Sequence, residues 1–451
     1  MLALTLARPH STPGPLMRDF ESYYAAGQTW SAHGDPYSAA IWKFEQTIPG
    51  VQAARGELLP FVGPPAFLPV WAFFSLLPFS VAAVLWGAIL LGSAVAVLVA
   101  TLRSTNALSI GALLAGACIF VGFGPFTSDL ALGQAALLSF AACVGATLWF
   151  DRSGLAGCVW SFFSAVQPNI AVALLSQIGK RRTWMPLLGA VVFFLALSLS
   201  ARGLHGLLSY FSDLIVHGQA ERFGLIQITP AAIGYGFGLP AIAAQFIGSL
   251  ATVTAAILAL AVLRLPYVKQ LWKLAILCTL LPFAIPFFHE HDFVVVLLAG
   301  LLCALLAENR TWTLAVTGTL LCAVDWLGLA QRPDGLLQSF LLAIALLLGL
   351  FAIAEQPARR LLLPSGVLLF LLGAGILAQH HQAPVWPDAM HGVTAMSAPV
   401  AQIWHGELER TGQFARDPFW AAMRLLTLFG TTLLAWASIS VAQQRDQLEI
   451  S

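Results

Sequence analysis

Long apolar stretches separated by polar turns dominate the chain, and their lengths predict helices. A bilayer core needs about 20 apolar residues per crossing helix. We expect about thirteen transmembrane helices, at 64–79, 80–102, 107–124, 131–150, 154–178, 184–201, 239–262, 270–288, 291–307, 311–329, 337–354, 361–379 and 419–441. The predicted fold is therefore an all-α polytopic membrane protein. It forms one domain over residues 1–451, with a first polar segment at 1–63 and a helical bundle at 64–441.

Composition supports this assignment. The 451 residues are 59% hydrophobic and only 10% charged, whereas a soluble protein carries roughly 25% charged residues. This scarcity of charged residues makes a lipid bilayer the expected partner. The net charge of +1 gives no reason to expect a nucleic-acid partner.

Basic residues indicate which ends of the helices face the cytoplasm. When the predicted spans alternate in direction, one face receives most of the basic clusters: Lys180-Arg181-Arg182, Arg264 with Lys269 and Lys273, Arg310, Arg359-Arg360 and Arg445. The positive-inside rule makes this face cytoplasmic. The long polar segments 1–63, 202–238 and 380–418, together with the loop around His289, then lie outside the cytoplasm, in a multi-pass protein of the cell membrane.

The most informative polar segment is 17–37, which contains Asp19, Tyr23 and Tyr24, and the turn Gly34-Asp35-Pro36-Tyr37. A carboxylate at a membrane–water boundary can act as a general base toward a sugar hydroxyl. An isolated acid of this kind is more often a solvated loop residue, and the glycine and proline of the turn are equally explained by turn geometry.

A second polar cluster, His289-Glu290-His291-Asp292, sits at the end of a predicted span. Consecutive ionisable residues are costly in apolar surroundings and indicate function by default. Three interpretations stay open. The first is recognition of a lipid phosphate by His289 and His291, with Asp292 orienting His291. The second is a divalent metal site with Glu290 and Asp292 as ligands, and the third is a solvated turn. No cofactor is certain.

Single polar residues also interrupt the predicted spans, namely Gln134, Gln167 and Asn169. Each is either a hydrogen-bonding link between helices or a substrate contact. Segment 204–216 predicts an amphipathic helix lying on the membrane.

Taken in order, these motifs resemble glycosyltransferase family 87. The resemblance rests on Asp19-Phe-x-x-Tyr23-Tyr24-Ala-Ala-Gly27, Gly34-Asp35-Pro36-Tyr37, Pro64-Pro65, Gly133-Gln134, Val166-Gln167-Pro168-Asn169 and Pro286-Phe-Phe-His289-Glu290-His291-Asp292-Phe293. It covers residues 19 to about 293, and beyond that only hydropathy matches. Three positions depart from the family pattern: Val166 stands for a lysine, His289 for a tryptophan and Asp292 for a second histidine.

The resemblance implies a GT-C fold and transfer of a sugar, plausibly mannose, from a polyprenyl-phosphate donor to a membrane glycolipid or glycan. Asp19 would be the general base of an inverting reaction, and His289, His291 and Asp292 would contact the donor phosphate. Substrate contacts would come from Tyr23, Tyr24, Asp35, Tyr37, Gln134, Gln167 and Asn169.

The family usually has a helix before the aspartate. Residues 1–18 are too short and too rich in proline to form one. Two explanations are open: this tail is translocated unaided, or a first helix precedes the given start. We favour the second.

Two other functions remain in view. A secondary transporter needs polar sites near the bilayer midplane, broken helices and inverted repeats; 167–169 is a candidate break, but we find no repeat in the sequence. A polymerase or ligase of lipid-linked glycans needs a large external loop rich in arginine, and 380–418 holds only Arg410 and Arg416.

Overall fold

The computed structural model describes residues 17–48, 58–265, 268–326, 328, 335–354, 356–382, 387, 393 and 395–450. These residues form helices joined by short connections, and within them the extended backbone is limited to two isolated bridges, Ser38 with Pro399 and Gln227 with His289. The all-α prediction is confirmed. Residues 1–16 of the predicted N-terminal tail and much of 383–394 lie outside the described residues.

The first half of the chain contains the helices that carry the candidate site. They are α2 (Arg18–Ser31), α3 (Ala40–Glu45), η1 (Pro65–Phe67), α5 (Leu68–Ser75), α6 (Phe79–Ser104), α7 (Ile110–Gly122), α8 (Gly124–Leu132), α9 (Ala136–Trp149), α10 (Gly154–Ser164), α11 (Pro168–Ala171), η2 (Val172–Gln177), η3 (Arg181–Thr183) and α12 (Trp184–Glu221).

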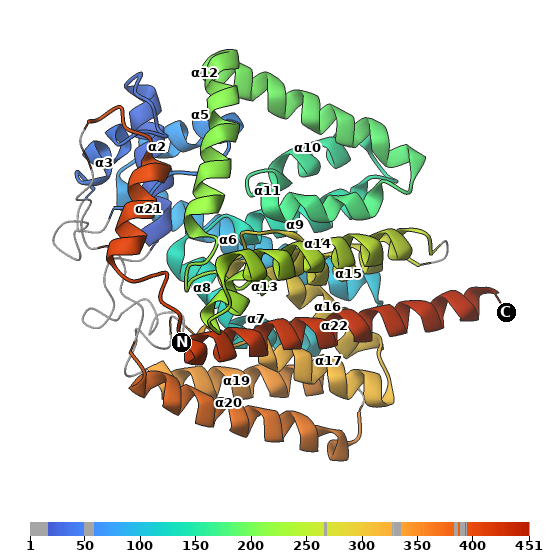
Figure 1. Cartoon of the computed structure of the whole chain (residues 1–451). Coiled ribbons are helices and arrows are strands. Elements are labelled where there is room, and N and C mark those ends of the chain that lie inside the picture. Colours follow the sequence, from blue (N-terminus) through green and yellow to red (C-terminus); the bar gives the residue numbers. More distant parts are fainter. Residues whose placement is uncertain are drawn as a thin grey trace.

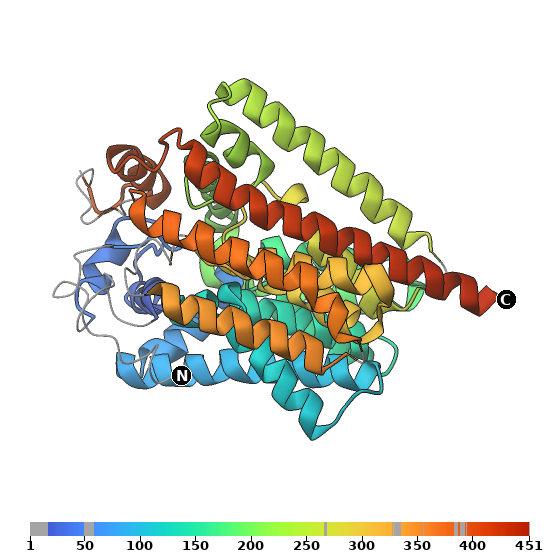
Figure 2. The same cartoon turned by 90° about the horizontal axis from the view of Figure 1, so that it is seen from below.

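The second half of the chain completes the bundle. Its helices are α13 (Pro230–Gly236), α14 (Ala241–Leu263), α15 (Gln270–Ala284), η4 (His291–Val296), α16 (Leu297–Leu306), α17 (Asn309–Leu321), α19 (Gly335–Ala352), η5 (Ala358–Leu361), α20 (Leu362–His380), α21 (Val400–Arg410) and α22 (Pro418–Ile450). The axes of helices α19, α20 and α22 lie roughly parallel in both views, with α20 running opposite to α22 (Figures 1 and 2).

Five helical stretches in the described part of the chain are long and apolar enough to cross a membrane: Phe79–Ser104, Arg181–Glu221, Ala241–Leu263, Ala358–His380 and Pro418–Gln444. They coincide with five of the thirteen predicted spans. Large apolar side chains on α14 are exposed, among them Ile242 (85%) and Phe246 (68%). A protein surface covered by water rarely carries such a continuous apolar face.

The other predicted spans correspond to shorter or broken helices. Helices α7 and α8 meet at a bend of 71°, and the pair is apolar enough to form either one broken span or a re-entrant loop. The predicted span at 154–178 is divided into α10, α11 and η2, because Pro168 cannot continue the hydrogen bonding of α10. The predicted span at 64–79 contains only the eight residues of α5 as α-helix.

Helix α12 has two arms that meet at Gly203, whose φ of 67° and ψ of 179° are not helical. Figure 1 shows the first arm running diagonally and the second turning sharply away from it. The first arm contains the predicted span 184–201. The second contains the predicted amphipathic helix 204–216.

The three long polar segments contact one another. Ala39 N–H donates to the Ala398 carbonyl at 2.9 Å, which joins the first segment to the last. Leu225 N–H donates to the Gln413 carbonyl at 2.9 Å, and Ile228 N–H donates to the Phe288 carbonyl at 2.9 Å. In both views α2, α3 and α21 gather at one end of the molecule, opposite the C-terminus (Figures 1 and 2).

Candidate functional site

Asp19 lies in the first turn of α2, where a carboxylate interacts favourably with the helix dipole. The start of this helix is fixed by Met17, whose backbone N–H donates to the Ala131 carbonyl at 2.8 Å. The Arg18 guanidinium contacts the Asp19 carboxylate at 3.1 Å, and the Asp19 side chain is 15% exposed. Asp19 thus keeps a partly covered position in which one oxygen of its carboxylate contacts Arg18.

Gln134 connects Asp19 to Tyr23. Its side-chain N–H donates to Asp19 Oδ2 at 2.5 Å, and its side-chain oxygen accepts from the Tyr23 hydroxyl at 2.8 Å. Gln134 reaches this position because Gly133, with a φ of 72°, ends α8 in the left-handed region. The Trp86 indole N–H donates to the Gly133 carbonyl at 2.8 Å and fixes the turn. The sequence predicted all three side chains as site residues, and the structure brings them together.

Asp292 is the centre of a second group. Its carboxylate accepts from Gln167 Nε2 at 2.8 Å, from Asn169 Nδ2 at 3.2 Å and from the backbone N–H of His289 at 2.9 Å. The break before Pro168 turns both amide side chains toward η4. All four of these predicted residues therefore belong to one hydrogen-bonded network.

Helix α9 connects the two groups. It begins at Ala136, two residues after Gln134. The hydroxyl of its Ser139 donates to the carbonyl of Ser164, the last residue of α10, at 2.5 Å. Helix α8, which ends at Gly133, packs against both α2 and η4. Gln134 and Gln167 each lie at a helix break, and the contacts of α8 and α9 hold these two breaks next to each other.

The Asp19 group and the Asp292 group are close enough to influence each other electrostatically. Burial raises the pKa of Tyr23, and the carboxylates of Asp19 and Asp292 raise it further. Burial alone would lower the pKa of His289, but the Glu221 hydrogen bond and charge outweigh burial and raise it, with smaller contributions from Asp292 and Asp19. One site thus holds carboxylates together with a histidine that favours its protonated form.

Glu221 was not predicted as a site residue. Its carboxylate is 3.0 Å from His289 Nε2 and also accepts from Gln227 Nε2 at 3.0 Å and from the Trp404 indole at 2.6 Å. Only 5% of the side chain is exposed. An acidic residue at the end of a mainly apolar helix could have marked Glu221 as a candidate. Nothing in the sequence, however, connects it with His289 or with Trp404.

Asp129 was also missed. It is fully buried in α8, and its carboxyl group lies near those of Asp19 and Asp292, while the backbone N–H groups of Ala136 and Leu137 at the start of α9 face it. A lone acid between two apolar stretches marked this position in the sequence.

Three other predicted contacts have their own partners outside these two groups. The Tyr24 hydroxyl donates to the Leu77 carbonyl at 2.7 Å, which fixes α2 to the connection between α5 and α6. Asp35 pairs with Arg202 at 2.8 Å, and the same guanidinium lies 4.6 Å from the centre of the Tyr37 ring. These contacts join the first polar segment to the bend of α12, so the structure gives Tyr24, Asp35 and Tyr37 anchoring roles.

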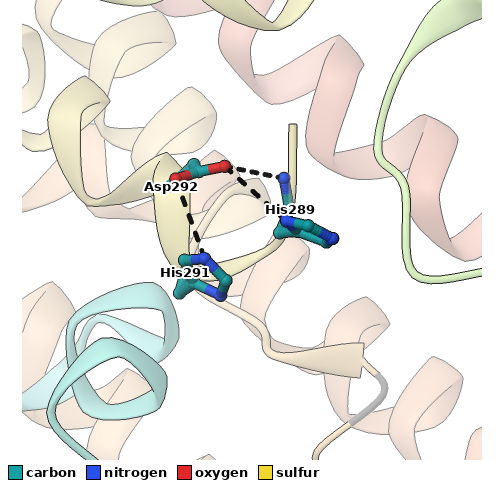
Figure 3. Close-up of side chains that lie close together, drawn as sticks. All are labelled: His289, His291 and Asp292. Carbon is teal, nitrogen blue, oxygen red and sulfur yellow. Dashed lines mark hydrogen bonds and ion pairs between the residues drawn. The ribbon is translucent and has the colours of Figure 1, made fainter. Parts of the chain in front are cut away.

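The nitrogen and oxygen atoms of His289, His291 and Asp292 lie within 4.8 Å of one another (Figure 3). Two imidazoles and a carboxylate are suitable ligands for a divalent ion. However, Asp292 already accepts three hydrogen bonds, and His289 Nε2 faces Glu221. Glu290 accepts from the Trp326 backbone N–H at 2.5 Å and lies outside the trio. Protein groups thus already contact the carboxylate of Asp292 and Nε2 of His289, which does not favour a metal.

Comparisons with known proteins give no assignment. No protein-family model matches the chain, and searches of curated proteins and of solved structures found no match.

Proposed function

We propose that this protein is a multi-pass membrane glycosyltransferase that transfers a sugar, plausibly mannose, from a polyprenyl-phosphate donor to a lipid or glycan acceptor at the extracytoplasmic face. The observation that carries the proposal is the convergence of Asp19, Gln134 and the Asp292 network, which come from separate parts of the chain. The order of these motifs is also what resembles family 87.

In this proposal Asp19 is the general base. It removes the proton from the acceptor hydroxyl, whose oxygen then attacks the anomeric carbon of the donor. The bond from the anomeric carbon to the phosphate oxygen breaks, and the lipid phosphate leaves with the electron pair. Attack on the face opposite the leaving group inverts the anomeric centre. Gln134 and Arg18 orient the Asp19 carboxylate for this step.

The leaving phosphate would be received by His289 and His291. The Glu221 carboxylate favours the protonated form of His289, and an imidazolium can donate hydrogen bonds to a phosphate oxygen. The two rings stack with centroids 5.2 Å apart, so they lie close enough to contact one phosphate group. Asp292 holds the backbone of His289 in place.

Membrane embedding is supported by the five long apolar helices and by the exposed apolar surface of α14. The basic clusters favour an arrangement in which the site faces away from the cytoplasm.

The test is sugar transfer in proteoliposomes that contain radiolabelled polyprenyl-phosphate-mannose and a membrane glycolipid extract. We expect Asp19→Asn to lower the rate roughly a hundredfold or more, because general-base catalysis contributes on that order. The control is Asp151→Asn, which removes an exposed carboxylate that pairs with Lys180 and should leave transfer unchanged. Equal transfer by wild type and Asp19→Asn would disprove the role of Asp19.

The same assay in EDTA separates phosphate recognition from metal binding. We expect transfer to continue in EDTA, because protein groups already satisfy Asp292 and His289. Loss of transfer in EDTA, restored by a divalent ion, would show that the trio holds a metal.

Solute uptake without sugar transfer would instead favour the transporter, for which the helix breaks at Pro168 and between α7 and α8 are the relevant feature.

A further inference from the structure

A polar cavity of about 640 Å³ opens at the start of α17. It lies among the N-terminal turn of α17, the short helix η5 and the region of α22 near Gln444. None of the residues discussed for the candidate site lines it. The lining includes Arg310, Arg359, Arg360, Glu308 and Asn309.

We propose that this cavity binds a phosphate group, supplied by the headgroup of an anionic phospholipid. Three arginines against one glutamate give the lining a positive charge. Guanidinium groups match the geometry of phosphate oxygens and form paired hydrogen bonds with them. The cavity therefore has the chemistry of an anion site.

The arginines are available to such a ligand. Arg360 donates to the side-chain oxygen of Asn309, which holds it at the cavity wall. Among the residues that the structure describes, no carboxylate forms an ion pair with Arg310 or Arg359. The first turn of α17 adds the positive end of its helix dipole at the same place.

The surroundings favour a lipid headgroup over free phosphate. Leu362 and Leu363 lie two and three positions after Arg360 and are 78% and 51% exposed. They begin α20, which is part of one of the five long apolar stretches. An acyl chain can lie against this apolar surface while its phosphate enters the cavity. Arg310 and Arg359-Arg360 also belong to the predicted cytoplasmic face, where anionic lipids meet basic pockets between helices.

The inference rests on the membrane embedding proposed above, but not on glycosyl transfer. Its test therefore measures binding and needs no sugar donor.

The experiment is native mass spectrometry of the purified full-length protein with phosphatidylglycerol or phosphatidylcholine added at matched concentrations. We compare wild type with the triple variant Arg310→Gln/Arg359→Gln/Arg360→Gln. The matched control removes three positive charges from the same predicted face outside the cavity: Arg181→Gln/Arg182→Gln/Arg264→Gln. Thermal unfolding checks that each variant is folded, and single Arg359→Gln, at an exposed position, replaces the triple variant if that variant does not fold.

We expect wild type and the control to retain phosphatidylglycerol in preference to phosphatidylcholine, and the triple variant to lose this preference. At about fivefold in affinity per arginine near a membrane surface, three arginines contribute on the order of a hundredfold. Inorganic phosphate that competes with the lipid would support the shared phosphate chemistry. Binding of phosphate without binding of phosphatidylglycerol would overturn the lipid assignment, and equal lipid retention by wild type and the cavity variant would overturn the site.

Discussion

The carboxylate of Glu221 and the imidazole of His289 lie 3.0 Å apart although 68 positions separate them in the chain. This contact joins the end of α12 to the loop that precedes η4. It also places a negative charge behind the histidine that we propose as a phosphate contact. The charge state of His289 is consequently decided by a residue that the sequence did not single out.

The first prediction concerns the pH dependence of stability. Because the pKa of His289 is raised in the folded protein, its contribution to stability is fully present below the unfolded pKa of 6.5 and is lost as pH rises through the folded pKa. We expect His289→Gln to lower the melting temperature more at pH 6 than at pH 9. His205→Gln, at an exposed position, is the control and should give a small effect that does not change with pH. A larger loss at pH 9 would contradict the assigned charge of His289.

The second prediction concerns Trp404, which donates its indole N–H to Glu221 Oε1 at 2.6 Å. Trp404→Phe keeps an aromatic ring but removes this donor from a buried carboxylate, which should cost about 1–3 kcal/mol. It should also slow sugar transfer, because Glu221 orients and charges His289.

The control for Trp404 is Trp420→Phe, which removes a comparable indole donor from the Gln382 carbonyl. That variant should lose stability while sugar transfer per folded molecule stays the same. If both variants affect transfer equally, Trp404 has no specific connection with the site.

The third prediction concerns Gly133, whose φ of 72° places Gln134 beside Asp19. A Cβ atom there would lie 2.8 Å from Met17 Sδ and 2.9 Å from Phe20 Cβ. Gly133→Ala should therefore destabilise the protein by about 1–3 kcal/mol, since a strained backbone and a close contact add.

The comparison for Gly133→Ala is Gly373→Ala in α20, where a Cβ atom meets nothing within 4 Å. Alanine favours a helix interior over glycine by up to about 1 kcal/mol, so this variant should be neutral or slightly stabilising in thermal unfolding. A neutral Gly133→Ala would show that the turn before Gln134 tolerates a side chain.

The sequence by itself determined the helical class and the candidate residues of the site. Long apolar stretches with few charges predict segments inside a bilayer. A helix satisfies the hydrogen bonding of every backbone N–H and C=O group there. Single polar residues in such stretches, such as Gln134, Gln167 and Asn169, stand out because their burial is costly without partners. The motifs named Asp19, Gln134, Gln167 and Asp292 as site residues, and the structure pairs Asp19 with Gln134 and Asp292 with Gln167.

The tertiary structure decided the rest. It divided the predicted spans into five long helices and several shorter or broken ones. Breaks such as those at Pro168 and Gly203 interrupt the helices where the surrounding helices pack against the break. It also gave Asp35 and Tyr37 contacts with Arg202 at the bend of α12 and brought Glu221 and Trp404 together with His289. Partnerships between side chains far apart in the chain depend on how the helices pack, and hydropathy and spacing along the sequence carry no record of that packing.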